Sequence, residues 1–317
     1  MSSHYRDWAF LLLCNLIWGS QFVIYKIVQR QVGPVFAALL PISVATLLLT
    51  PIVWYKRPKR NPLAQGRSVG ARDVMQFVLI GIAGQVVAQL FVAWGVRYTL
   101  ASNAALIVLA LPISTALMAY LLLGERMTPA RWMSFAFAIA GVIVCAGINW
   151  KEVDLVGGSF LLGNGLLFLA INGSAFYNVY SKKLLARFSP LEVLLYSYCV
   201  VVVFMLPIGL YTQPQILTIM ANFRAEVWLG ILLLGVFQYF LAMVLFLTVL
   251  TRLDATQAGL SNYLITFFGV ITAAVVLHEA LTKSMIFGGL LVLASTLLVT
   301  VYEKRPWTKN SVSKLPV

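Results

Sequence analysis

Charged residues are scarce in this chain of 317 residues. They make up 10% of it, against about 25% in a typical soluble domain. Hydrophobic residues make up 61%, and the mean hydropathy is +0.91, so a soluble fold is excluded. The net charge of +13 does not indicate a nucleic-acid partner, because the basic residues lie between apolar runs rather than together on one water-facing surface.

Cysteine and histidine are also rare. Cys14, Cys145 and Cys199 each fall inside an apolar run, without the spacing of metal ligands or of a disulfide framework. The two histidines are His4 and His278. We therefore expect no metal and no cofactor, and we interpret the cysteines as small packing residues.

Long apolar runs dominate what is present. Crossing about 30 Å of hydrocarbon takes about 20 helical residues, and ten runs have that length. They lie near 8–28, 34–55, 74–96, 101–123, 131–149, 157–180, 191–211, 227–250, 255–277 and 284–302. The sequence therefore predicts an all-α membrane protein with ten transmembrane helices. The first run exceeds a signal-peptide core in length and is expected to stay uncleaved. Short polar connections make neighbouring helices antiparallel and leave no room for a soluble domain.

The basic residues predict the orientation. With the N-terminus in the cytoplasm, the inner segments hold 17 Lys and Arg residues and the outer loops hold five. The positive-inside rule then places both termini in the cytoplasm of an inner-membrane protein. The basic segment 56–60 is explained by the same rule, or alternatively by a lipid-headgroup or partner site. The polar tail 304–317 is predicted to be disordered.

The chain repeats itself at an offset of 154 residues. Residues 17–22 and 171–176 share four identities in six, and Ala101 corresponds to Ala255. Glu125 corresponds to Glu279. The halves, 1–150 and 151–303, each contain five helices, and an odd number forces the second to enter the membrane from the opposite side. Inverted repeats are the architecture behind alternating access; a duplication kept only for packing is the alternative.

These residues resemble the EamA-type branch of the drug/metabolite transporter superfamily over nearly the whole chain. The resemblance is carried by the following motifs: Trp18-Gly19-Ser20-x-Phe22 with Lys26, Ala101 leading to Pro112, Gly124-Glu125, Gly173-Ser174, Ala255, and His278-Glu279. Two departures are Thr266, where the family commonly has proline, and Asn172, which matches Trp18. The resemblance implies export or exchange of a small metabolite such as an amino acid. It also implies a cavity among helices 1–4 and 6–9, with helices 5 and 10 peripheral.

Polar and aromatic side chains near the span centres are the predicted substrate-binding residues. They are Trp18, Gln85, Gln89, Asn103, Asn172, Tyr177, Gln238, Tyr239, Asn262 and Tyr263. Amides at such depth must find partners, because hydrocarbon offers none. Each amide has the alternative role of bonding one helix to another, and each aromatic ring has that of packing. Asn103 has the alternative role of a helix cap.

Four further residues are predicted to gate the pathway or to lie at helix ends. Lys26 either attracts an anionic group or extends its amine to the interface. Pro112 removes a backbone hydrogen bond and is predicted to kink the fourth helix. Glu125 and Glu279 end symmetry-related helices and are candidates for proton coupling, with a purely structural role as the alternative.

The distribution of acids favours a transporter without a buried carboxylate. All ten Asp and Glu residues lie at or beyond a span end, so no proton relay is predicted at the midplane. The expected partners are a small neutral or zwitterionic substrate and the lipid bilayer; the sequence does not distinguish a monomer from a homodimer. The alternatives are a receptor or assembly protein and, less favoured, a membrane enzyme acting on a lipid-linked substrate. The enzyme would need converging catalytic groups, which the sequence does not show.

Overall fold

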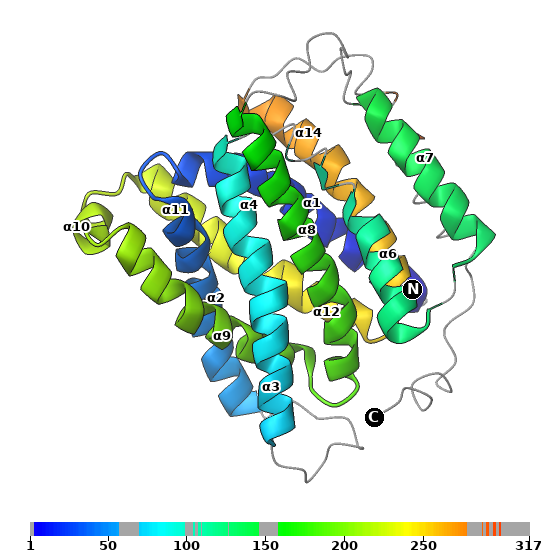
Figure 1. The fold of residues 1–317 in the computed structure, drawn as a ribbon, viewed down its shortest axis with the longest axis horizontal. Coiled ribbons are helices and arrows are strands. Elements are labelled where there is room, and N and C mark those ends of the chain that lie inside the picture. Colours follow the sequence, from blue (N-terminus) through cyan, green and yellow to red (C-terminus); the bar gives the residue numbers. More distant parts are fainter. Residues whose placement is uncertain are drawn as a thin grey trace.

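The part of the chain that the structure describes is helical throughout. This computed structural model describes residues 3–56, 70–98, 110–125, 127–145 and 158–277, with isolated positions at 104, 107, 108 and between 287 and 298. Within these residues there is no strand, and the helices pack side by side in one bundle (Figure 1). Five helices are long and apolar enough to cross a membrane. The predicted all-α membrane fold is confirmed.

The first half supplies five of the predicted spans. Their elements are α1 (Ser3–Val28), α2 (Pro34–Lys56), a third span made of α3 (Ala71–Leu79), η2 (Ile80–Val86) and α4 (Val87–Tyr98), then α6 (Ala110–Leu123) and α7 (Pro129–Cys145). The third span is continuous, but η2 is a π-helical turn, which is wider than an α-helical turn.

The second half follows the same order as far as the structure describes it. Its elements are α8 (Gly158–Leu185), α9 (Pro190–Thr212), the short α10 (Ile216–Ala221), an eighth span made of α11 (Ala225–Leu233), η3 (Leu234–Ala242) and α12 (Met243–Leu250), and a ninth made of α13 (Ala255–Leu260) and α14 (Tyr263–Leu277). The segment of α10 falls between two predicted spans, and its six residues are too few to cross a bilayer. Most of the predicted tenth span and all of the tail 304–317 lie outside the described residues.

The 154-residue offset holds in the backbone. The π-helical turns begin at Ile80 and at Leu234, which are 154 residues apart. The ninth span is interrupted by a turn at Ser261–Asn262, and the fourth has a turn at Val108, which is 154 residues before Asn262. The two inverted repeats therefore share their irregularities as well as their helices. Interrupted helices in corresponding positions are typical of transporters built from inverted repeats.

The interruption in the fourth span corrects the prediction for Pro112. The residue lies in the first turn of α6 rather than in the middle of a continuous helix. The turn comes just before it, where the Leu111 backbone N–H donates to the Val108 carbonyl at 2.9 Å. Proline is tolerated in a first helical turn because the N–H that it lacks would have no helical partner there.

Close helix contacts depend on glycine. A Cβ atom on Gly173 of α8 would lie 2.9 Å from the backbone nitrogen of Ala88 in α4 and 2.9 Å from the carbonyl oxygen of Gly84. A Cβ on Gly19 of α1 would lie 2.8 Å from the backbone nitrogen of Gly269 in α14. These pairs bring the two halves into direct contact, as small residues do between membrane helices. By contrast, α7 lies at the edge of the bundle (Figure 1), as predicted for the fifth span.

Candidate functional site

A cavity of about 90 Å³ lies between the two halves. It contains side chains from the first, third, fourth, sixth, eighth and ninth spans. Seven of the predicted substrate-binding residues line it: Trp18, Gln85, Gln89, Tyr177, Gln238, Tyr239 and Asn262. Four pairs of lining residues are 154 positions apart: Gln85 and Tyr239, Gln89 and Met243, Val108 and Asn262, and Leu111 and Ile265. The cavity is therefore built from equivalent positions of the two repeats.

Three predicted binding residues are not among those that line this cavity. Asn172 follows Ile171, which does line it, but one residue turns a helix by about 100°. The Asn172 amide instead donates to the Phe168 carbonyl of its own helix at 2.8 Å. Tyr263 is fully buried beside Asn262 without lining the cavity. Asn103 lies outside the described residues.

Hydrogen bonds occupy part of the predicted polar set. The Gln89 amide donates to Gln85 Oε1 at 3.1 Å, and the Tyr239 hydroxyl donates to Gln89 Oε1 at 2.9 Å. The hydroxyls of Tyr25 and Tyr239 also share a hydrogen bond. The Tyr239–Gln89 bond joins η3 to α4, and the Tyr25–Tyr239 bond joins α1 to η3, whereas the Gln89–Gln85 bond stays within the third span.

Gln238 and Asn262 differ from that pair, because they keep unused hydrogen-bonding capacity. The Gln238 amide donates to Gln21 Oε1 at 2.6 Å. Among the described residues, Gln238 Oε1 and both polar atoms of Asn262 have no partner, although these atoms are buried. Leaving a buried polar atom unpaired costs about 1–3 kcal/mol. Both residues line the cavity, so their side-chain amides are candidates to bind a solute.

A second polar cluster lies at one end of the bundle, where Glu125 follows α6. Its carboxylate accepts hydrogen bonds from the backbone N–H groups of Ala255 and Thr256, at 2.8 and 3.0 Å, and from the Thr256 hydroxyl at 2.8 Å. The Lys182 ammonium lies 3.4 Å from Glu125 Oε1. Burial by itself would raise the pKa of Glu125, but the Lys182 charge and these donors outweigh it and hold the pKa below its ordinary value.

Three more ion pairs lie at the same end of the bundle as Glu125. Arg187 contacts both carboxylate oxygens of Asp73, at 2.6 and 3.2 Å, and Arg252 contacts Asp7 at 2.6 Å. The third is the short contact between Arg131 and Asp254. Each pair joins a residue of the first half to one of the second, and each acid is largely buried. This arrangement, which we call the ion-pair end, holds the halves together on one side of the cavity.

Three of the four predicted gating residues can be placed. Glu125 lies at the ion-pair end, and Pro112 lies in the first turn of α6. Lys26 lies in the last turn of α1 and is not among the residues that line the cavity. Glu279 lies outside the described residues. The sequence identifies the acids as span-end charges without pairing them, because pairing across the halves depends on how the helices pack.

A model of the EamA-like transporter family matches the chain twice, at residues 8–147 and 161–301. The chain belongs to this family. A protein of Streptantibioticus cattleyicolor, named a probable terminal-alkyne amino-acid exporter, is 28% identical over 302 residues, covering 92% of each chain. An uncharacterized transporter of Archaeoglobus fulgidus is 23% identical over 296 residues, covering 92% of this chain and 96% of the other. A crystal structure superposes with a TM-score of 0.72 at 16% identity, over 94% of this chain and 97% of that one, and shows the shared fold.

As a member of the EamA-like family, the chain is a membrane transporter. Its cavity is also lined by polar residues that were not in the set predicted from the sequence. Gln21, Ser174 and Asn178 line the cavity together with the predicted set. Gln21 lies three residues after Trp18, so the two share a helix face. That spacing was the signal available in the sequence. None of the described residues that line the cavity carries a formal charge.

Proposed function

We propose that this EamA-like transporter is a secondary transporter that exports or exchanges a small neutral or zwitterionic metabolite, such as an amino acid, by alternating access. The observation that carries the proposal is that Gln238 and Asn262, which line a cavity between inverted halves, have side-chain polar atoms without a partner among the described residues. Substrate sites in such transporters lie at the repeat interface, near interrupted helices.

The chemistry of the lining supports a substrate without net charge. Asn262 offers both a donor and an acceptor, and Gln238 adds an acceptor. These groups suit the carboxylate and ammonium of an amino acid, which cancel each other's charge. Trp18 and Tyr177 add aromatic surface beside these polar groups. The relative named as an amino-acid exporter agrees with this class of substrate.

The four ion pairs support a conformation that is closed on one side. We place the ion-pair end in the cytoplasm, because it lies on the side of the basic segments of an inner-membrane protein. In this conformation the inner gate is closed. Opening the gate separates Glu125 from α13. The N–H groups of Ala255 and Thr256 then lose their acceptor, because the first N–H groups of a helix have no partner within the helix.

Counterflow in proteoliposomes tests the proposal. Purified protein is reconstituted with an unlabelled neutral amino acid inside, and uptake of the labelled compound is followed over time for a panel of amino acids. We expect transient accumulation above that of protein-free liposomes for at least one neutral member. Folded protein that gives no counterflow with any member of the panel would contradict the proposal.

A further inference from the structure

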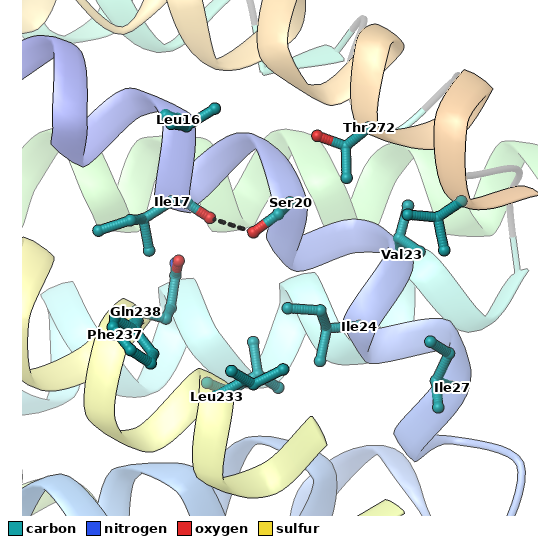
Figure 2. Close-up of a pocket in the computed structure, with 12 residues that line it drawn as sticks. Leu16, Ile17, Ser20, Val23, Ile24, Ile27, Leu233, Phe237, Gln238 and Thr272 are labelled. Atoms are coloured by element: carbon teal, nitrogen blue, oxygen red, sulfur yellow. Dashed lines mark hydrogen bonds between the residues drawn. The ribbon is translucent and has the colours of Figure 1, made fainter. Parts of the chain in front are cut away.

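A groove of about 450 Å³ lies on the other side of α1 from the cavity. It runs between α1, the α11–η3 segment and α14, and Figure 2 shows its walls. Ile17 and Ile24 of α1 face Leu233 and Phe237 of the eighth span, and Val23 lies on the side of α1 towards α14. The groove is far larger than the cavity, and most of the side chains that line it are apolar.

The hydroxyls of the groove are already hydrogen-bonded. Ser20 Oγ donates to the Ile17 carbonyl at 2.7 Å, as Figure 2 shows, and Thr272 Oγ1 donates to the Phe268 carbonyl at 2.7 Å. Each of these bonds stays within one helix. The groove therefore suits a hydrocarbon group. Its lining residues Leu16, Phe237 and Val276 are exposed, so lipid acyl chains reach it from the bilayer.

Gln238 is the one described residue that lines both the groove and the cavity. Its side chain extends from η3 towards α1 (Figure 2) and bonds to Gln21, which faces the cavity. On either side of this bond, α1 and η3 are joined by Tyr25 with Tyr239 and by Cys14 with the Ala242 carbonyl. The Gln21–Gln238 pair thus closes the gap between the two spaces.

We propose that the groove binds the apolar side chain of the transported amino acid, while its ammonium and carboxylate groups bind at Gln238 and Asn262. This inference rests on the proposed function and narrows the substrate to neutral amino acids with long unbranched or branched aliphatic side chains. A cavity of about 90 Å³ accommodates the polar head of such a molecule, whereas sites for whole ligands usually measure about 300–1,000 Å³. The tail then needs the adjoining apolar space, which Gln238 opens by leaving Gln21.

The first test compares alanine with norleucine in counterflow by the wild-type protein. Burying each additional CH2 group strengthens binding about threefold to fourfold. Norleucine is therefore expected to have an apparent affinity at least about tenfold higher than alanine. Equal affinities, or counterflow of other amino acids in the panel but of neither of these two, would overturn the inference while leaving the proposed function intact. Only the absence of counterflow with every member of the panel would overturn both.

The second test fills the groove. Leu233→Trp places a large ring in it, whereas Leu232→Trp, one position away on the same helix, adds the ring to an exposed position that does not line the groove. We expect L233W to remove most of the preference for norleucine and to leave alanine counterflow within about twofold of wild type. L232W is expected to change neither.

Two results would overturn the inference: equal loss of both substrates in L233W, and unchanged norleucine preference. The second would mean that the groove holds only a lipid acyl chain. If L233W gives little folded protein, Thr272→Leu narrows the groove from α14 and is interpreted by the same two criteria.

Discussion

Asn262 combines features that few residues of this chain share. It is 1% exposed, it lies in the turn between α13 and α14, and it lines the cavity with both polar atoms unpaired among the described residues. Burying an unpaired amide costs stability, which is a reason to expect a role in binding. Its depth and polarity were visible in the sequence. Its lack of partners was not, because that depends on which side chains of other helices reach it.

Replacing Asn262 by leucine is expected to separate transport from folding. Counterflow should fall about fivefold to 150-fold, because an amide that contacts substrate contributes on the order of 1–3 kcal/mol. The melting temperature should stay constant or rise, since a buried unpaired amide is removed. The control is Asn172→Leu, whose amide bonds within its own helix; its counterflow should be unchanged. Normal counterflow in N262L would show that Asn262 does not bind substrate.

Gln85→Leu is expected to behave differently, because this amide already serves the fold. Gln85 Oε1 accepts from Gln89, which in turn accepts from Tyr239. Removing it leaves the Gln89 amide unpaired, at a cost of about 1–3 kcal/mol. Thermal denaturation should show a lower melting temperature for Q85L than for N262L. The reverse order would mean that the Gln85–Gln89–Tyr239 hydrogen bonds contribute little.

At the scale of the element, the sequence predicted where helices lie better than how they are interrupted. The described spans fall within a few residues of the predicted ranges, because about 20 apolar residues are needed to cross a bilayer. The π-helical turns and the turns at Val108 and Asn262 were not predicted. Membrane helices are apolar on the lipid side and on the protein side alike, so hydrophobic periodicity gives little information on rotation. For the same reason the sequence does not show that Asn172 lies beside, rather than among, the residues that line the cavity.

The α4–α8 contact provides a matched pair of glycine substitutions. Gly173→Ala forces a methyl group against backbone atoms of α4, and overpacking of this kind costs about 1–3 kcal/mol. Gly165 lies in the same helix, and a methyl group there would have nothing within 4 Å, so G165A should be neutral or stabilising. Melting temperatures of the purified variants check this. Equal effects of the two substitutions would contradict the close approach of α8 and α4.

The ion-pair end predicts a pH dependence. The pKa of Glu125 is lowered in the closed conformation, so its stabilisation is present above the ordinary pKa of a glutamate and disappears as the pH falls through the lowered value. The free energy of unfolding should therefore be constant between about pH 6 and 8 and fall in acid.

Glu125→Gln should remove about 3 kcal/mol from the free energy of unfolding at neutral pH. Glu226→Gln, in an exposed pair with Arg30, should change little. If the wild-type protein instead loses this stability with a midpoint near neutral pH, the result would indicate proton coupling at Glu125.

At the scale of the whole molecule, the repeat was the most informative part of the sequence. The offset of 154 aligns the π-helical turns, the interrupted spans and four pairs of cavity-lining residues. Seven of the ten predicted binding residues line the cavity because mid-span depth and inward orientation follow from polarity in a bilayer. The four ion pairs between the halves could not be predicted, since the acids and their partners are far apart in the chain.

Accessibility of the cavity from each side of the membrane tests the central claim of alternating access most directly. Val108→Cys places a thiol on the cavity wall, and Cys14→Ser, Cys145→Ser and Cys199→Ser remove the native thiols. A membrane-impermeant thiol reagent is added to vesicles of either orientation, with and without a transported amino acid. We expect the introduced thiol to react from both sides, with substrate changing the two rates in opposite directions. Reaction from one side only, at a rate that no transported amino acid alters, would contradict the account.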